Sequence, residues 1–333
     1  MKKILVFLLC FSYGLSAQDV DSKIRLNALG FGSCNRTDLD PKIWEAIAQK
    51  QIEAWVWLGD IVYTDEKSML DLEEKYTLQK SLPAYQQLRE QAAIFGVWDD
   101  HDFGTNDGGG AFDKKAQSRK LLFDFLDLPE AHPARRRTGA YQSYCFGEDE
   151  EKVCLYLLDV RYFKEPYVLD PSPNQRYKKN SGSLLGEEQW KWLEKELENN
   201  DAVVSLFAGG IQLLSSEHAY EKWSNFPVAQ QRFFDLLIKN KIKNPIYLSG
   251  DRHIAEVSRR QISPDYWLYD ATSSGLTHSY EGLEEEYNPY RIGPLMTHLN
   301  FGMIRWDWEN RKLALQILDD NGAVRFQQNI PIQ

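Results

Sequence analysis

The sequence has few cysteines, no surplus of basic residues and no apolar run long enough to cross a membrane. Four cysteines in 333 residues are too few for a disulfide-dense scaffold. The 39 basic and 49 acidic side chains give a formal net charge of −10. A general nucleic-acid binder needs a basic face that releases counterions from phosphates, so this charge argues against that class. We therefore expect no transmembrane segment and no general nucleic-acid partner.

The sequence also lacks internal repeats, low-complexity blocks and linkers rich in Pro, Gly and Ser. Its composition, with 43% hydrophobic, 13% aromatic and 26% charged residues, argues against a disordered chain. The length fits one large domain or two ordinary ones, and nothing in the pattern demands a second. We predict a single domain over residues 18–333.

Residues 1–17 are typical of a secretory signal peptide. Lys2 and Lys3 precede a short apolar run at 4–11, and the small residues Ser16 and Ala17 come directly before a cut after Ala17. The run is too short for a membrane span, and no twin arginine is present. We therefore expect export by the general secretory (Sec-type) route, and a mature protein in the periplasm or outside the cell.

Two cysteines lie in a predicted hairpin. The segments 141–146 and 152–158 read as strands around a polar turn, and this pairing places Cys145 opposite Cys154. In an oxidising compartment they either form a cross-strand disulfide or remain two small buried side chains, and the sequence leaves both readings open. Cys34 is left over, and an unpaired cysteine in a secreted protein requires its own explanation.

Strands and helices alternate along much of the chain. Helices are expected at 40–51, 69–91 with a break at Pro83, 113–126, 186–198 and 227–240. Further strands are expected at 24–31, 54–58, 92–98, 203–208, 246–248, 266–272, 301–308, 312–318 and 323–331. Buried strands that alternate with helices, followed by a meander of strands, predict an α/β domain built on two sheets.

Four of these strands end in side chains that can bind metal. Loops beyond the carboxyl ends of strands form the ligand crevice of open α/β sheets, so the four ends can converge on one point. Each motif alone is more often a turn, an acidic loop or core packing. Together, carboxylates crowded after apolar strands repel one another unless a cation neutralises them. The side chains concerned are Cys34, Asp60, Tyr63, Asp99, Asp100, His101, Asp102, Asp251 and His253.

Six segments of the chain carry recognisable motifs. They are Gly32-Ser33-Cys34, Gly59-Asp60-x-x-Tyr63, Trp98-Asp99-Asp100-His101-Asp102, Leu158-Asp159-x-Arg161, Ser249-Gly250-Asp251-x-His253 and the segment 272–278 that ends at His278. Together they resemble the alkaline phosphatase D (PhoD-like) family of the calcineurin-like metallophosphoesterases. The resemblance runs from about residue 24 to residue 308, and it implies a four-layer α/β/β/α sandwich of two mixed β-sheets flanked by helices, with a two-metal site at their edge.

The resemblance also implies a division of the ligands. Asp60 would bridge both metals; Cys34, Tyr63 and His253 would complete the first site; Asp100 and Asp251 would serve the second. Thiolate and tyrosinate ligands favour ferric iron, and additional carboxylates favour a hard cation such as calcium. We therefore expect Fe³⁺ plus Ca²⁺, with Zn²⁺ or Mn²⁺ as alternatives. The wider superfamily differs here: it has Asn at position 100, His at position 251 and a Gly-His motif where Gln212 follows Gly210.

Several further side chains are candidates for catalysis and substrate binding. His101 is expected to act as the acid or to donate to a phosphoryl oxygen, with Asp102 orienting it. Arg161 either binds a phosphate oxygen or pairs with an aspartate. Arg252, Gln212 and His278 are candidate substrate-binding residues; Arg252 reads equally well as a surface charge, and His278 equally well as a structural side chain.

The expected function is the hydrolysis of a phosphate monoester or diester by a secreted enzyme, in which a metal-bound hydroxide attacks phosphorus. A phospholipase C-like phosphodiesterase using the same site is the nearest alternative, and a non-catalytic calcium-binding secreted module is another. A serine hydrolase centred on Ser33 is disfavoured, because the trailing glycine of a nucleophile elbow is missing.

Overall fold

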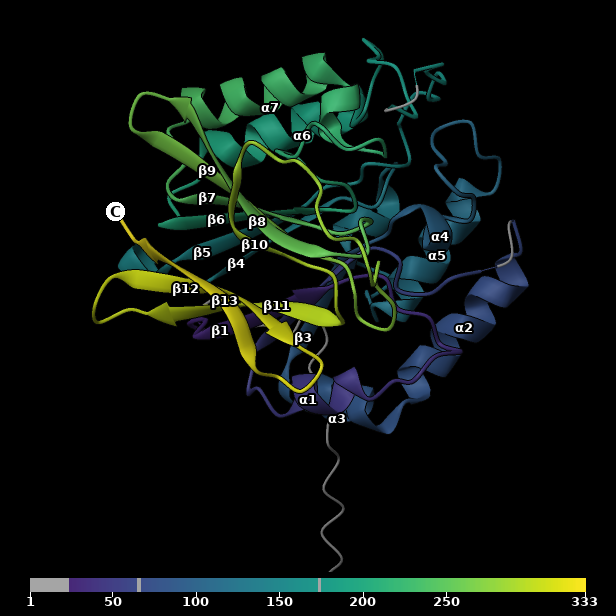
Figure 1. Ribbon diagram of the computed structural model, residues 1–333, viewed down its shortest axis with the longest axis horizontal. Coiled ribbons are helices and arrows are strands. Elements are labelled where there is room, and N and C mark those ends of the chain that lie inside the picture. The colour runs from purple at the N-terminus through teal and green to yellow at the C-terminus, as the bar shows by residue number, and fades with distance from the viewer. Residues whose placement is uncertain (1–23, 65–66, 173–174) are drawn as a thin grey trace, which may run out of the picture.

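The computed structural model describes residues 24–64, 67–172 and 175–333 (Figure 1). The predicted signal peptide, residues 1–17, lies outside the described residues, so its existence stays a prediction. Within the described ranges, no helix is long and apolar enough to cross a membrane.

The strands form two mixed sheets. In the first, the three N-terminal strands run parallel and the C-terminal strands continue the sheet antiparallel; in the second, four neighbouring strands run parallel. The first has the order β13 (Val324–Pro331), β12 (Lys312–Asp319), β11 (Asn300–Asp307), β1 (Ala28–Gly32), β2 (Ala54–Leu58), β3 (Ala93–Val97). The second has the order β10 (Arg291–Met296), β8 (Ala255–Ser263), β9 (Tyr266–Ser273), β7 (Pro245–Ser249), β6 (Val204–Gly209), β5 (Val153–Leu157), β4 (Gln142–Phe146).

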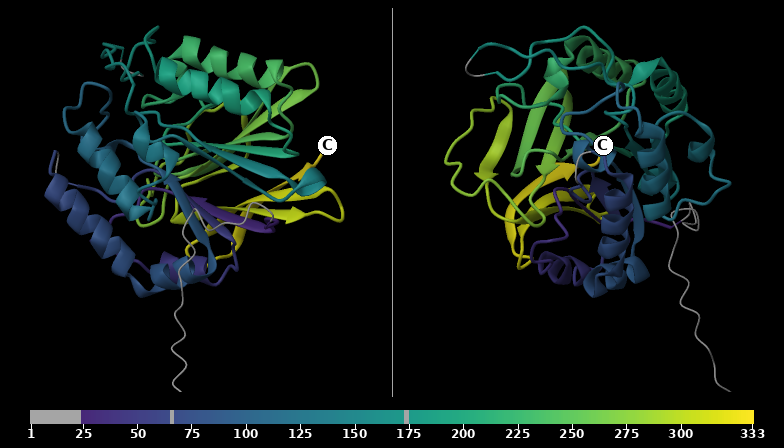
Figure 2. Two further views of the ribbon diagram at one scale, coloured as in Figure 1. Left: turned by 180° about the vertical axis from the view of Figure 1, so that it is seen from behind. Right: turned by 90° about the vertical axis from the view of Figure 1, so that its right-hand side faces the viewer.

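Helices cover the outer face of each sheet (Figures 1 and 2). Buried side chains of the helices at 186–198 and 227–239 pack on the second sheet, and those of the helices between residues 43 and 125 pack on the first. A third apolar cluster fills the space between the two sheets. The predicted four-layer α/β/β/α sandwich is therefore confirmed. The helices are α1 (Ile43–Ala48), α2 (Met69–Ser81), α3 (Pro83–Gln91), α5 (Lys115–Phe125), α6 (Gly186–Glu198) and α7 (Pro227–Lys239).

Strand β2 shows how the sequence builds these layers. Successive side chains of a strand point to opposite faces. Val56 and Leu58 pack between the two sheets, whereas Trp55 and Trp57 pack under the helices. Both faces are buried, which explains why this strand is an uninterrupted apolar run rather than an alternating one.

Most predicted elements are confirmed, and two strands were missed. The break at Pro83 separates α2 from α3, and the segments 54–58 and 186–198 match β2 and α6. The missed strands, β8 and β10, pair with each other at one edge of the second sheet. Strand β10 contains Gly293 and Pro294, which disfavour a strand prediction and are tolerated at a sheet edge.

The hairpin of β4 and β5 pairs Cys145 directly with Cys154, and the two residues form a disulfide. The sequence left this pairing open, and the structure resolves it in favour of the bridge. Cys34 is the free cysteine of the described residues, and it is buried.

Replacing Cys145 and Cys154 together with alanine should lower the free energy of unfolding by about 2–3 kcal/mol. A bridge across a sequence separation of 9 residues closes a short loop in the unfolded chain. The stabilisation expected from a disulfide increases with the length of that loop, so it is modest here. Urea denaturation of the oxidised protein and the double variant measures the difference. A wild-type midpoint that does not respond to reductant would contradict the prediction.

Candidate metal centre

The carboxyl ends of the parallel strands of both sheets meet at one edge of the sandwich. Gly250, just after β7, packs closely against the first sheet: a Cβ atom there would lie 2.5 Å from the Leu58 carbonyl oxygen and 2.6 Å from Ser33 Oγ. Only glycine permits that approach. The potential metal ligands that follow the strands of the first sheet therefore lie next to those that follow β7.

The predicted iron-type ligands lie together. Donor atoms of Cys34, Asp60 and His253 are all within 4.8 Å of one another. The Tyr63 hydroxyl donates to Asp60 Oδ2 at 3.0 Å and lies 3.0 Å from His253 Nε2. Cys34 Sγ lies 3.6 Å from the same Asp60 oxygen. Thiol, phenol, carboxylate and imidazole therefore converge on one point.

A second group of donors shares Asp60 with the first. One ligand atom each from Asp60, Asp100 and His101 also lie within 4.8 Å of one another. The backbone N–H of His101 donates to Asp60 Oδ1 at 3.2 Å, so the two oxygens of Asp60 face different groups. Asp251, the remaining predicted ligand, is close enough for its charge to raise the pKa of Asp60.

The backbone at the site is strained. Non-glycine residues rarely adopt a positive φ, and each such residue costs roughly 1–3 kcal/mol. This cost tends to persist where function requires a particular side-chain direction. The predicted ligands with positive φ are Cys34 (61°), Asp60 (48°), Asp251 (68°) and His253 (53°).

Asp102 acts on the backbone rather than on the His101 ring. Its carboxylate accepts N–H groups from Asp60 at 3.3 Å, Ile61 at 3.2 Å and Asp99 at 2.7 Å. It lies in the one-turn helix α4 (Asp100–Phe103), where it completes a capping box with Asp99. The Asp102 carboxylate therefore contacts backbone N–H groups and not the His101 imidazole, contrary to expectation. These hydrogen bonds connect the loop after β2 with the loop after β3. The His101 ring instead packs on Tyr63, with centroids 4.1 Å apart.

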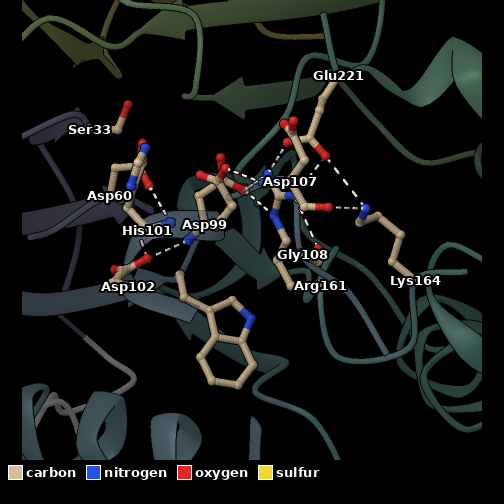
Figure 3. A network of polar contacts seen from close by, with 12 residues as sticks. Ser33, Asp60, Asp99, His101, Asp102, Asp107, Gly108, Arg161, Lys164 and Glu221 are labelled. Carbon is tan, nitrogen blue, oxygen red and sulfur yellow. Dashed lines mark hydrogen bonds and ion pairs between the residues drawn. The ribbon is translucent and has the colours of Figure 1, made fainter. Parts of the chain in front are cut away.

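Arg161 is completely buried, and all three nitrogens of its guanidinium group donate hydrogen bonds to other residues of the protein (Figure 3). Nε donates to Asp99 Oδ1 at 2.6 Å, and the two terminal nitrogens donate to Glu221 at 2.7 and 2.6 Å. Nη1 also reaches the carbonyl oxygen of Gly108 at 3.3 Å. The expected pairing with an aspartate is confirmed. A direct phosphate contact would require these bonds to break.

The Arg161 network includes residues that the sequence analysis did not single out. Lys164 Nζ lies 3.5 Å from Glu221 and donates to the Asp107 carbonyl oxygen at 2.9 Å. The Asp107 backbone N–H donates to Asp100 Oδ2 at 2.7 Å, which connects this network to the second ligand group. The glycine-rich segment that begins at Asp107, shortly after the Asp99–Asp102 motif, is a sequence feature that could have indicated a role for Asp107. No comparable motif surrounds Glu221.

The three other substrate-binding candidates have different surroundings. Arg252 is buried, not a surface charge, and its Nη2 contacts both Glu286 oxygens at 2.8 and 2.7 Å. Gln212 is also buried, and its Nε2 donates to Glu256 and Thr272 inside the second sheet, both at 2.7 Å. His278 lies at the candidate metal centre: its ring is 4.4 Å from His253 and 4.9 Å from Tyr63.

Burial sets the protonation of these groups in the absence of metal. It raises the pKa of Asp60 well above its ordinary value, and the charges of Asp100, Asp102 and Asp251 add to the shift. Burial, followed by His278 and His101, lowers the pKa of His253 to about 3, so its ring is neutral near pH 7. A neutral imidazole is the form that binds metal. Crowded carboxylates beside imidazole, thiol and phenol fit a pair of cations.

Removing metal should therefore destabilise the protein more at pH 8 than at pH 5. Burial raises the pKa of Asp102 from 3.8 to about 7, and those of Asp60 and Asp251 shift the same way. Such groups hold protons more tightly in the folded state, so the metal-free fold loses stability as the pH rises from about 4 through 7. Thermal denaturation with and without chelator measures this. An equal effect of chelator at both pH values would contradict it.

Comparison with known proteins identifies a family and a shared fold. The family described as PhoD-like phosphatase matches residues 29–279. A solved structure described as "Structure of PhoD" covers 94% of this chain and 73% of its own, with 14% identity and a TM-score of 0.69, which shows a shared fold. No curated protein sequence matches the chain.

Two other solved structures align over most of the chain but less closely. A 5'-nucleotidase from Candida albicans SC5314 covers 90% of this chain and 52% of its own, with 10% identity and a TM-score of 0.42. Wild-type Vps29 complexed with Zn²⁺ from Entamoeba histolytica covers 92% and 99%, with 9% identity and a TM-score of 0.33. Similarity at this level adds nothing to the assignment.

Proposed function

This chain belongs to the PhoD-like phosphatase family and is a metal-dependent phosphoesterase; we propose that it is secreted and hydrolyses phosphate monoesters or diesters at the site around Asp60. The observation that carries the proposal is the direction of the two Asp60 oxygens. Oδ2 faces Tyr63 and Cys34, and Oδ1 faces the backbone of His101. A carboxylate shared in this way can hold two cations.

The proposed ligands combine the two donor groups with the family resemblance, which adds Asp251 and assigns His101 to acid catalysis instead of metal binding. Cys34, Tyr63 and His253 would hold the first ion with Asp60, and Asp100 and Asp251 the second. When bound, such a metal pair supplies Lewis acidity at the phosphoryl group and activates water. The anionic thiolate and phenolate donors at the first position support ferric iron, and carboxylate oxygens at the second support calcium.

The disulfide supports secretion. Disulfides persist in oxidising compartments and are rare in the reducing cytosol. The Cys145–Cys154 bridge is therefore the structural feature that fits the predicted signal peptide at 1–17. Identifying the N-terminal residue of protein recovered outside the cytoplasm tests this part directly, and an intact Met1 would contradict it.

Metal analysis combined with a rate comparison tests the function. We expect about one iron and one calcium per chain, a visible charge-transfer band, and hydrolysis of 4-nitrophenyl phosphate or its bis-ester. The ratio of these two rates separates a phosphatase from a phosphodiesterase. Protein that binds calcium without iron and turns over neither substrate would overturn the proposal.

Replacing His101 with glutamine should lower kcat by about 100-fold while leaving the metal content unchanged. The ring is partly exposed beside Tyr63, where it can donate a proton or hydrogen bond to a departing oxygen, and a positioned general acid typically contributes 10²–10⁴-fold. The loss should be larger for alkyl than for 4-nitrophenyl esters, because a poor leaving group needs the proton more. Equal losses on both would argue against an acid role.

A further inference from the structure

The metal centre is bordered by an aromatic surface that belongs to no part of the chemistry described above. Tyr280 lies next to His253: its backbone N–H donates to the His253 carbonyl oxygen at 2.8 Å, and the two rings are 5.0 Å apart. Tyr220, from the loop after β6, lies 6.4 Å from the Tyr280 ring. Two loops distant in sequence therefore bring two tyrosine rings to the edge of one site.

Both rings are supported by a neighbouring group and remain partly exposed. The Arg252 guanidinium packs 4.6 Å from the centre of the Tyr220 ring, and His253 packs against Tyr280. Arg252 is itself fixed by Glu286, which holds the support beneath Tyr220 in place. Nevertheless Tyr220 remains 38% exposed and Tyr280 39% exposed. Supported, partly exposed aromatic rings are suited to contact with another flat group.

The aromatic surface is continuous with the proposed acid. From Tyr280 the rings pass to His253 at 5.0 Å, then to His278 at 4.4 Å and to Tyr63 at 4.9 Å. The Tyr63 ring in turn lies 4.1 Å from that of His101. A substrate whose phosphoryl group occupies the metal centre would therefore have part of its ester group within reach of the two tyrosines.

We propose that Tyr220 and Tyr280 form a stacking platform for a planar aromatic group in the ester portion of the substrate. This inference rests on the proposed function and names the substrate class of the same site. Stacking needs a flat π-surface, so the platform should favour an aromatic ring over a saturated ring of the same size. A flexible acyl or glycerol chain would gain much less from it.

Benzyl phosphate and cyclohexylmethyl phosphate provide the test, because their alcohols have similar acidity and differ in flatness. We expect wild-type protein to favour the benzyl ester about tenfold in kcat/KM. Tyr280→Leu should remove most of this preference by raising KM for the benzyl ester about tenfold, with less than about a twofold effect on the cyclohexylmethyl ester. Tyr280→Phe, which keeps the ring, should retain the preference.

Tyr287→Leu is the matched control, because Tyr287 lies in the same loop and is 69% exposed. It should leave both esters unaffected. No preference in the wild type, or equal losses on both esters in Tyr280→Leu, would overturn the platform. If the enzyme accepts only diesters, the methyl diesters of the same alcohols replace the monoesters.

The same comparison can be made without turnover. If metal-loaded wild type hydrolyses neither ester class, the proposed function fails, and calorimetric binding of benzylphosphonate and cyclohexylmethylphosphonate decides the platform separately. Preferential binding of the benzyl compound that is lost in Tyr280→Leu and kept in Tyr280→Phe would support it. Equal binding of the two compounds would overturn it.

Discussion

Asp60→Asn is expected to remove both metal ions and to lower phosphoesterase kcat/KM by at least about a thousandfold. Asp60 Oδ2 faces the Tyr63 hydroxyl and Cys34, and Oδ1 faces the second donor group. An amide offers a single neutral oxygen, so it cannot serve two cations at once. Catalysis by two metals depends on both, and losing one electrostatic contact to the reacting group already costs roughly 10²–10³-fold.

The fold should survive this substitution. In metal-free protein the Asp60 carboxylate is unfavourable, because burial and then the charges of Asp100 and Asp102 raise its pKa. An uncharged amide of the same shape relieves that repulsion, and Asn tolerates the φ of 48° found there. Metal-free Asp60→Asn should therefore be at least as stable as metal-free wild type, while it fails to gain stability when metals are added.

Metal content by elemental analysis, activity and thermal denaturation with and without metal measure these outcomes. Asp149→Asn is the matched control, because Asp149 has a similar φ of 50° and lies in the exposed turn between β4 and β5. It should change none of the three quantities. A variant at position 60 that keeps one tightly bound ion and most of its activity would show that Asp60 is not shared.

The convergence of the proposed metal ligands could be predicted because their positions follow from strand polarity. Cys34, Asp60, Asp100 and Asp251 each come two or three residues after an apolar strand. Parallel strands end at the same edge of a sheet, so recognising the strands was sufficient to group these residues. The register within each sheet did not need to be known.

The residues around the ligands could not be assigned in the same way. Arg161 and Glu221 are 60 positions apart, and both lie in irregular loops where no periodicity indicates direction or burial. The capping role of Asp102 depends on α4, a four-residue helix too short to leave a pattern. Contacts between loops depend on the final packing of both sheets, so no local pattern in a single sequence predicts them.

Among these loop contacts, the Arg161 network should contribute most to the stability of the fold. Arg161→Met is expected to lower the free energy of unfolding by about 3–5 kcal/mol, because it leaves Asp99 and Glu221 buried without their main cationic partner. Arg232→Met is the control: Arg232 is about one-third exposed and pairs with Glu187 and Glu194 at the surface. Exposed pairs of this kind contribute about 0–1 kcal/mol.

The pH dependence of the stability lost in Arg161→Met shows whether the loss comes from an unpaired buried charge or from a packing defect. Burial alone would raise the pKa of Glu221, but Arg161 and Lys164 hold it at about 2. In wild type this carboxylate stabilises the fold above pH 4.5, and the contribution disappears as the pH falls toward 2. Without Arg161 the pKa of Glu221 rises, so the variant relieves its buried charge by taking up a proton.

The difference in unfolding free energy between wild type and Arg161→Met should therefore narrow from pH 7 to pH 4. Adding Glu221→Gln to Arg161→Met should recover part of the lost stability at pH 7 and little at pH 4, because the amide needs no counter-ion. Urea denaturation of the three proteins at both pH values measures this. A loss that is independent of pH and unaffected by Glu221→Gln would show that Arg161 stabilises the loops by packing alone.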